Sequence, residues 1–443
     1  MRSYLILLMC GLFLIQYFVQ SRWLEYVVVV MAFAAFAGSV TKASSMPRWL
    51  GMIMMGSGMV LEFQKGGGIE GISRGMSMNL PLLTLVILVP LLSLPLKLDG
   101  DFEIIHAVLR RLKHHPRKLF AGITSVVFLL GPILNLGSIR VVDDLLKNLK
   151  LPSVILAKSY LVGFSTTMVW SPYYASVGLV LYYLKVPMGE YLPYGIGMAF
   201  LFLFAGNVIF WIWSRRHPIG HEEPVTEQSS NIRISHLLRL GLKIAGFMSI
   251  TLLVEYRTQW SMLVIVSLFS IAFPLLWGIV TKKWKLLLSQ LIDFRDKGVP
   301  IMNNEILLFT SAGLLGASLQ DTSFGSGIKY FLNSMAHQSF LLFAIVVMAI
   351  VIIMSFAGIH QLVTVTALVT QMNAVELGTT THVLAMLLML SWSVSSVLSP
   401  LNPLNLLVSR LSGFSGIETG IRMNGVHLSI VTLIGLLVIT MIH

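Results

Sequence analysis

Residues 165–181 read STTMVWSPYYASVGLVL, and residues 393–409 read SVSSVLSPLNPLNLLVS. When the chain is shifted by 228 residues, six of the seventeen paired positions are identical. Each stretch places hydroxyl side chains in front of a Ser-Pro pair, within a long apolar run. Because proline removes a backbone donor and disrupts a helix, both stretches predict an interrupted helix. The pair therefore indicates an internal repeat with one broken helix in each copy.

The rest of the chain is too apolar for a soluble protein. Of its 443 residues, 56% are hydrophobic and 11% are charged, and the mean hydropathy is +0.83. A soluble domain carries about 25% charged residues, so a soluble enzyme, a disordered chain and a fibrous protein are excluded. Runs such as 339–357 and 426–442 are apolar on every face, which indicates membrane-spanning helices rather than the alternating strands of a barrel.

The apolar runs predict an all-α polytopic membrane protein with about 11 transmembrane helices plus two re-entrant hairpins, since a bilayer core needs roughly 20 apolar residues per helix. The hairpins are expected at 119–150 and 338–373, where Gly, Pro, Asn or His interrupts the run near its middle. The expected crossings are 3–20, 24–41, 47–63, 79–96, 152–183, 192–213, 241–255, 259–280, 300–318, 376–408 and 425–442.

The basic residues orient this arrangement. With a cytoplasmic N-terminus, 24 of the 31 Lys and Arg residues fall on the cytoplasmic side, six fall outside, and Lys158 lies within a span. This asymmetry follows the positive-inside rule. Topology therefore explains the net charge of +12, and we expect the lipid bilayer rather than nucleic acid as a partner. The single cysteine, Cys10, excludes an intramolecular disulfide and a Cys-based zinc site.

The repeat divides the chain into two halves. Under this orientation the amphipathic segment 101–115 lies inside and its counterpart 326–337 lies outside, so the repeats are expected to be inverted. Inverted repeats with broken helices are typical of secondary transporters that bind their substrate near the midplane. The predicted domains are an N-terminal transmembrane helix at 1–23, a first repeat at 24–213, a cytoplasmic linker at 214–240 and a second repeat at 241–443. The first repeat contains the hairpin 119–150 and the broken helix 152–183. The second repeat contains the hairpin 338–373 and the broken helix 376–408.

The tips of the hairpins and the breaks in the helices are the candidate binding site. An interrupted helix at membrane depth leaves backbone groups that need a partner or a ligand. Hydroxyls, amides and helix N-termini suit an anion, and freed carbonyls suit Na⁺. The alternative is that these Ser and Thr residues only pack between helices. The candidate substrate- or ion-binding residues are Asn135, Ser138, Thr166, Thr167, Ser171, His360, Thr364, Ser395, Ser396, Ser399 and Asn402.

Three charged residues of the first hairpin are candidates for charge coupling. Arg140 and Asp144 are four residues apart, so they can pair along one helix face, and Asp143 lies beside them. Alternatively, they solvate the cytoplasmic mouth of the hairpin. No catalytic residue and no metal site is expected.

Other titratable side chains near the membrane have two interpretations each. His360 either carries a proton or packs as a hydrogen-bonded side chain. Lys158 and Glu305 lie near the ends of their spans; each is either a functional charge at membrane depth or a side chain that reaches the interface. No cofactor is expected apart from Na⁺ or H⁺ as the coupling ion.

With these features the chain resembles the ion transporter superfamily, which includes the divalent anion:sodium symporters, the large membrane subunits of TRAP transporters, the arsenite and citrate permeases and the p-aminobenzoyl-glutamate transporters. Eleven spans, two hairpins and two broken helices are most similar to the divalent anion symporters. The resemblance implies that hairpin tips and helix breaks bind a carboxylate and Na⁺. It also implies a homodimer whose transport domain makes an elevator motion, with 101–115 and 326–337 as hinges.

We therefore expect a secondary active transporter of a small, carboxylate-type organic anion, coupled to Na⁺ or H⁺, and not an enzyme. Two alternatives remain open: a TRAP-like membrane subunit that needs partner proteins, and a lipid or polyprenyl-phosphate carrier on the same fold. A membrane enzyme is disfavoured because the longest expected external stretches, 64–78 and 319–337, are short. The expected location is the cytoplasmic membrane, as a multi-pass protein with its N-terminus inside.

Overall fold

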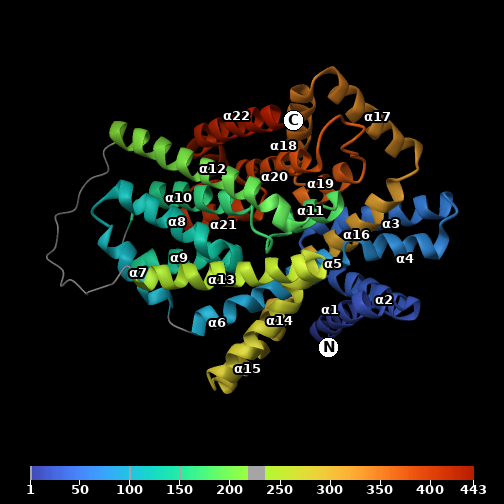
Figure 1. The fold of residues 1–443 in the computed structure, drawn as a ribbon, viewed down its shortest axis with the longest axis horizontal. Helices are drawn as coiled ribbons and strands as arrows, with labels where there is room; N and C mark the ends of the chain where they lie inside the picture. The colour runs from blue at the N-terminus through green and yellow to red at the C-terminus, as the bar shows by residue number, and fades with distance from the viewer. Residues whose placement is uncertain (1, 99–100, 150, 218–234) are drawn as a thin grey trace.

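The computed structural model describes residues 2–98, 101–149, 151–217 and 235–443. Every regular element within these ranges is a helix, which confirms the predicted all-α fold (Figure 1). Among the described residues, eight helical segments are long and apolar enough to cross a membrane by length and composition. Residues 218–234 of the predicted linker lie outside the described part.

The N-terminal region consists of paired helices. Helices α1 and α2 pack together, and α3 and α4 form a hairpin against the later helix α16 (Figure 1). The bounds are α1 (Arg2–Val19), α2 (Arg22–Val40), α3 (Ser45–Gln64), α4 (Gly68–Met78), α5 (Leu80–Leu88), the 3₁₀ turn η1 (Val89–Leu92) and α6 (Ser93–Leu98).

The segment 64–78, which was expected to be an external stretch, is mostly helix α4. Gly66 and Gly68 have φ values of +76° and +54°, which allow the tight reversal after α3. At Gly75 an added Cβ would lie 2.8 Å from the Leu314 side chain, so its lack of a side chain lets α4 approach α16 closely. Close helix packing therefore makes this glycine-rich stretch helical.

The first half continues with a helical hairpin and a broken helix. The chain reverses between α8 and α9 at Asn135, whose φ is +51°. Helix α10 stops at Thr167, and helical structure resumes at Ala175. The bounds are α7 (Asp101–Arg111), α8 (Pro116–Leu134), α9 (Gly137–Leu146), η2 (Lys147–Leu149), α10 (Ser153–Thr167), α11 (Ala175–Leu184) and α12 (Met188–Arg216).

The second half has a similar order of elements. Its hairpin reverses at Gly358, with φ of +83°, and its broken helix stops at Leu398 and resumes at Pro403. The bounds are α13 (Ser235–Thr258), α14 (Met262–Val280), α15 (Trp284–Asp293), the π-helix η3 (Phe294–Gly298), η4 (Val299–Ile301), α16 (Asn303–Leu319), α17 (Ser323–Gln338), α18 (Phe340–Phe356), α19 (Gln361–Val369), α20 (Thr381–Leu398), α21 (Pro403–Ser412), the π-helix η5 (Glu418–Met423) and α22 (Gly425–Ile442).

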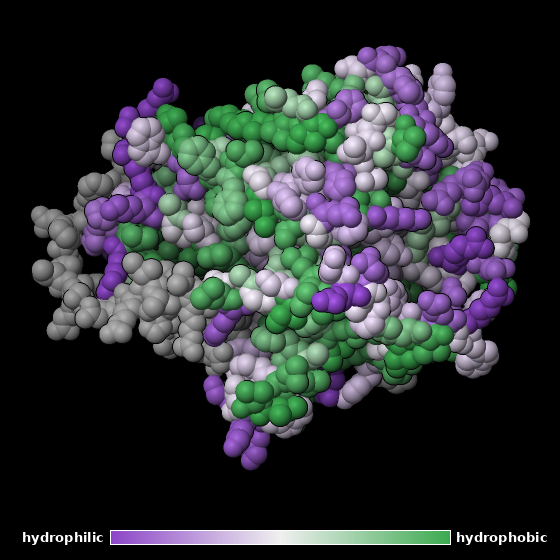
Figure 2. All heavy atoms as spheres, viewed as in Figure 1, coloured by the Kyte–Doolittle hydropathy of each residue, from purple (hydrophilic) through white to green (hydrophobic). Residues whose placement is uncertain are grey.

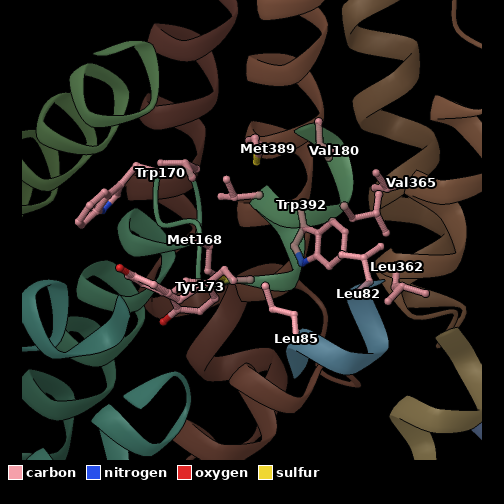
Figure 3. Packing of buried hydrophobic residues seen from close by; sticks show 14 of the residues in the cluster. Leu82, Leu85, Met168, Trp170, Tyr173, Val180, Leu362, Val365, Met389 and Trp392 are labelled. Carbon is pink, nitrogen blue, oxygen red and sulfur yellow. The ribbon is translucent and has the colours of Figure 1, made fainter. Parts of the chain in front are cut away.

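The two broken helices meet at the centre of the molecule. The Ser393 hydroxyl of α20 donates to the carbonyl oxygen of Ser165 in α10 at 2.9 Å, and these two residues are related by the 228-residue shift. Apolar side chains fill the space around the contact: Figure 3 shows Trp392 beside Leu82 and Leu362. The centre is therefore a packed core in which the two helix breaks are held in place.

The outer surface is strongly apolar. Phe204 on α12 is 70% exposed and Val280 at the end of α14 is 78% exposed. Hydrophobic side chains cover α12, α14 and α15, whereas hydrophilic ones gather along α17 and where α3 turns into α4 (Figure 2). A surface of this kind suits contact with lipid, where the helices satisfy their own backbone groups.

Candidate functional site

A buried polar network joins the tip of the second hairpin to the break after α20. Gln361 donates from Nε2 to the Ser355 hydroxyl at 2.8 Å and accepts at Oε1 from Asn402 Nδ2, also at 2.8 Å. The Ser399 hydroxyl donates to the Ser355 carbonyl oxygen at 2.8 Å. All four side chains are buried. The network fixes the hairpin tip against the start of α21.

Two helix N-termini converge at this network. His360 caps α19, where its Nδ1 accepts from the backbone N–H of Leu362 at 3.2 Å. Asn402 caps α21, where its Oδ1 accepts from the backbone N–H of Leu404 at 2.9 Å. A helix N-terminus carries a partial positive charge that favours an anion. The fold therefore places the positive dipole ends of α19 and α21 beside the same cavity.

A cavity of about 270 Å³ opens beside these N-termini. One wall is made by the hairpin tip and the start of α21, and the opposite wall by the start of α3 and the first turns of α16. Of the predicted site residues, His360 and Asn402 line this cavity. Its polar lining consists of Ser44, Asn304, Glu305, Ser355, His360, Gln361 and Asn402.

Sequence reasoning did not select the other five polar lining residues as site candidates, and two of them, Gln361 and Glu305, have central positions. Gln361 belongs to the recognised hairpin tip, but its central position in the network depends on the fold of the tip. Glu305 was expected to be either a functional charge or a side chain that reaches the interface; its Oε2 atom is buried, with no hydrogen-bond partner among the described residues. A carboxylate near the start of an expected membrane span is the sequence signal that could have selected it.

The hairpin and helix break of the first half differ in their contacts from those of the second half. Gly131 lies against the first break, and an added Cβ there would meet the Thr167 side chain at 2.9 Å and the Tyr174 hydroxyl at 3.1 Å. The Tyr174 hydroxyl is buried without a hydrogen-bond partner in the described part of the chain. Ser171 accepts from the backbone N–H of Tyr173 at 3.4 Å, as Ser399 does from Leu401 at 3.3 Å. The serine of the Ser-Pro pair thus has the same local role in both copies.

Several predicted hydroxyls bond within their own segment. Thr166 and Thr167 both donate to the carbonyl oxygen of Gly163, at 2.7 and 3.0 Å. Ser138 donates to the Asn135 carbonyl at 2.7 Å, and Ser395 donates to the Trp392 carbonyl at 3.0 Å. The Asn135 side chain accepts from the backbone N–H of the next residue at 2.8 Å. The hydroxyls of Thr364 and Ser396 are buried and have no partner among the residues described.

The charged cluster of the first hairpin corrects the predicted pairing. Asp144 accepts from Lys147, one turn further along the helix, rather than from Arg140. Asp143 is buried and accepts from the Tyr160 hydroxyl of α10 at 3.1 Å. Lys147 follows α9 directly, so its flexible side chain reaches Asp144 near the exposed end of the hairpin. These contacts join α9 to α10 and do not reach the cavity.

A second cavity, of about 400 Å³, lies near Pro172 and the end of α11. Its acidic residue, Glu255 of α13, accepts from the backbone N–H groups of Met188 and Gly189 at 2.9 and 3.1 Å. Glu255 thus neutralises the N-terminus of α12. Because its carboxylate is committed to this helix end, the cavity beside the second hairpin is the stronger candidate site.

Comparison with known proteins shows a likeness in fold. No protein-family model and no curated protein matches the sequence. Among solved structures, the fold is similar to the crystal structure of the YdaH transporter of Alcanivorax borkumensis, with a TM-score of 0.53, 13% identity, and coverage of 89% of this chain and 97% of that chain. At this identity the likeness concerns the fold alone.

The apolar helices indicate a membrane-embedded protein, and its fold is similar to that of a solved transporter. The superfamily named from the sequence is a finer assignment that stays a prediction.

Proposed function

We propose that the protein is a secondary active transporter of a small, carboxylate-type organic anion, coupled to H⁺ or Na⁺. The convergence of two helix N-termini on one cavity is the observation that carries this proposal. A carboxylate in the cavity would meet the partial positive charges of α19 and α21 and the amide groups of Gln361 and Asn402. Such groups recognise an anion without the cost of burying a full positive charge.

The walls of the cavity suggest how access alternates. One wall belongs to the second hairpin and its broken helix, and the other to α3 and α16. We propose that the hairpins, broken helices and final helices move as one body past the remaining helices, with α7 and α17 as hinges, in a homodimer. The contact between repeat-related Ser165 and Ser393 supports inverted repeats that meet at a central axis.

The orientation inferred from charge assigns a side to the cavity. The connection from α2 to α3 and the start of α16 are both expected inside, and both contribute to its lining. We therefore propose that this conformation opens the site toward the cytoplasm. Cysteines introduced at Ser44 and at Gln320, the two ends of the α3–α16 region, should react with an impermeant maleimide from opposite sides of the membrane.

Transport in proteoliposomes tests the proposal. We would measure uptake of radiolabelled succinate, citrate and benzoate with Na⁺ and H⁺ gradients imposed separately. Ser399→Ala removes a hydroxyl that links the hairpin tip to the break, so uptake should fall. Ser391→Ala is the matched control, because Ser391 lies in α20, the helix that ends just before Ser399, is also buried, and donates to the carbonyl of Leu387 in its own helix.

Equal loss of uptake in both serine variants would show that the loss comes from a less stable helix and not from the bond between the hairpin tip and the break. No uptake of any probe by folded protein would favour a substrate delivered by partner proteins, as in a TRAP-like system.

A second candidate function is transport of an amphiphilic or lipid-linked anion. It is favoured by an apolar cavity of about 660 Å³ between α13, α14 and the first hairpin, where Ile133 forms part of the wall. The cavity has the volume for a hydrocarbon chain. A photoreactive polyprenyl-phosphate analogue should label Phe247 or Phe273 if this function is correct, and unlabelled prenyl phosphate should compete with it.

A further inference from the structure

Glu305 occupies an unusual position for a carboxylate. It is the third residue of α16 and lines the cavity opposite the second hairpin tip. Its Oε2 atom is buried and accepts no hydrogen bond from any described residue. A charged carboxylate in a low-dielectric site needs a partner, a proton or a cation.

The hydrogen-bond acceptors next to Glu305 already accept from other donors. The Oδ1 atom of Asn304 accepts from the backbone N–H and the hydroxyl of Ser44, at 3.0 and 3.1 Å. The side-chain oxygens of Gln361 and Asn402 accept within the hairpin network. A metal cation takes several oxygen ligands at once, whereas a proton needs only one carboxyl oxygen. These surroundings favour a proton on Glu305.

Charged and titratable groups also lie on the elements around α16. His360, at the second hairpin tip, is the other titratable residue in the lining of this cavity. Arg48 on α3 donates from a terminal nitrogen to the carbonyl of Ala43, and its Nε is buried without a hydrogen-bond partner among the described residues. Arg2 on α1 donates to the carbonyls of Gly38 and Pro300. Ion pairs between described residues of this region include Lys65–Glu62, Arg295–Asp296 and Lys297–Asp293.

We propose that Glu305 makes anion binding at this site depend on a proton. The inference rests on the proposed function and names H⁺ as the ion linked to substrate binding. When Glu305 is ionised, its negative charge opposes a carboxylate held at the N-termini of α19 and α21. When Glu305 is protonated, the repulsion disappears and the carboxyl O–H becomes a donor to the bound anion.

A structural role for Glu305 makes a different prediction. A carboxylate in the first turn of a helix stabilises the helix dipole, and this role requires ionisation rather than a proton. Glu190 provides a matched control, because it also lies in the first turn of its helix, α12, but its side chain is 62% exposed. Glu190→Gln removes an exposed first-turn carboxylate outside the cavity, so it should leave the pH dependence of anion binding unchanged.

Carbodiimide labelling tests the proton without any substrate. A hydrophobic carbodiimide reacts with protonated carboxyl groups, and labelled peptides are identified by mass spectrometry. In the full-length protein in liposomes, labelling at Glu305 should increase several-fold from pH 9 to pH 5. Labelling that does not change with pH, or no labelling at Glu305 while other carboxyls react, would overturn the proposal.

Binding measurements test the link to the anion. For the labelled carboxylate that the wild-type protein transports, the dissociation constant should rise by about tenfold per pH unit above the titration range of one carboxyl. The Glu305→Gln variant should bind the anion tightly at every pH tested, with no pH dependence. The Glu305→Asp variant should restore the pH dependence. An unchanged slope in Glu305→Gln would contradict the proposal while leaving the proposed transport function intact.

Failure of the wild-type protein to take up any carboxylate would instead contradict the proposed function. In that case, the labelling experiment alone decides whether Glu305 binds a proton.

Discussion

The two helix breaks have similar backbones and different chemistry. In both copies the serine of the Ser-Pro pair accepts a hydrogen bond from the backbone two residues later. At the position where the second copy has Asn402, the first copy has Tyr174, whose hydroxyl has no partner in the described part of the chain. A repeat can therefore conserve the geometry of a site while only one copy keeps the polar groups that a ligand needs.

The largest expected effect tests this asymmetry in transport. Asn402→Ala leaves the Gln361 amide without its donor and removes the cap of α21, so uptake of the transported carboxylate should fall by about 5- to 100-fold, as expected for a lost buried hydrogen bond. Tyr174→Phe removes a hydroxyl without a partner and should change uptake by less than about twofold. Proteoliposome uptake measures both variants, and the opposite order would show that the first copy holds the site.

The next largest effect is a loss of stability when the side chains that bond to two repeat-related carbonyl groups are removed. The Tyr191 hydroxyl donates to the carbonyl of Val169 at 2.8 Å, and Asn405 Nδ2 donates to the carbonyl of Val397 at 2.7 Å. Tyr191→Phe and Asn405→Leu should each reduce stability by about 1–3 kcal/mol, because each leaves a buried carbonyl unsatisfied. Asn405→Leu should cost more, since this side chain also bonds to Gly416, Ser409 and Thr419.

Thermal unfolding in detergent, followed by intrinsic fluorescence, measures these losses. Tyr174→Phe is the control for removal of a tyrosine hydroxyl. If it lowers the unfolding temperature as much as Tyr191→Phe does, the carbonyl bond is not the cause.

A third test compares two glycines of the first hairpin. Gly131→Ala places a Cβ 2.9 Å from the Thr167 side chain and should destabilise the protein by about 1–3 kcal/mol through overpacking. At Gly137 the nearest atom, the Leu134 Cβ, lies 3.9 Å away, so Gly137→Ala should have little effect. Equal unfolding temperatures for the two variants would show that the first tip does not pack tightly against its break.

The smallest effect concerns the second amphipathic helix, α17. Lys329 donates to Glu376 at 2.7 Å and Asn333 donates to it at 3.1 Å, and these contacts, Lys329 foremost, hold the pKa of the Glu376 carboxyl below its ordinary value. The contribution of these contacts to the stability of α17 is therefore present above the ordinary carboxyl pKa. It is lost as the pH falls through the lowered pKa of Glu376.

Glu376→Gln should speed hydrogen exchange of α17 amides slightly at pH 7, because a surface ion pair contributes little. Mass spectrometry of α17 peptides measures the exchange, with α7 peptides as the internal reference. Wild type and variant should converge at acidic pH; a difference that grows on acidification would contradict the assignment.

The sequence by itself determined the class of fold and the positions of the breaks. A 56% apolar composition with few charges admits only membrane helices, and the Ser-Pro pairs at Ser171 and Ser399 predict the interruptions because proline cannot continue a helix. Asn402 was predicted as a site residue because it lies in such a break, and His360 because it is a polar residue at the expected tip of the second hairpin. Their chemistry could be inferred from residue type and from distance to a helix break.

Only the tertiary structure decided which of the candidate groups are available to a ligand. Thr166 and Thr167 satisfy their hydroxyls within α10, whereas Gln361 joins the hairpin to the break across 41 residues of sequence. Glu305 reaches the same cavity from a different helix. Hydrogen-bond partners and burial depend on which helices pack together, and periodicity along one chain segment carries no information about that choice.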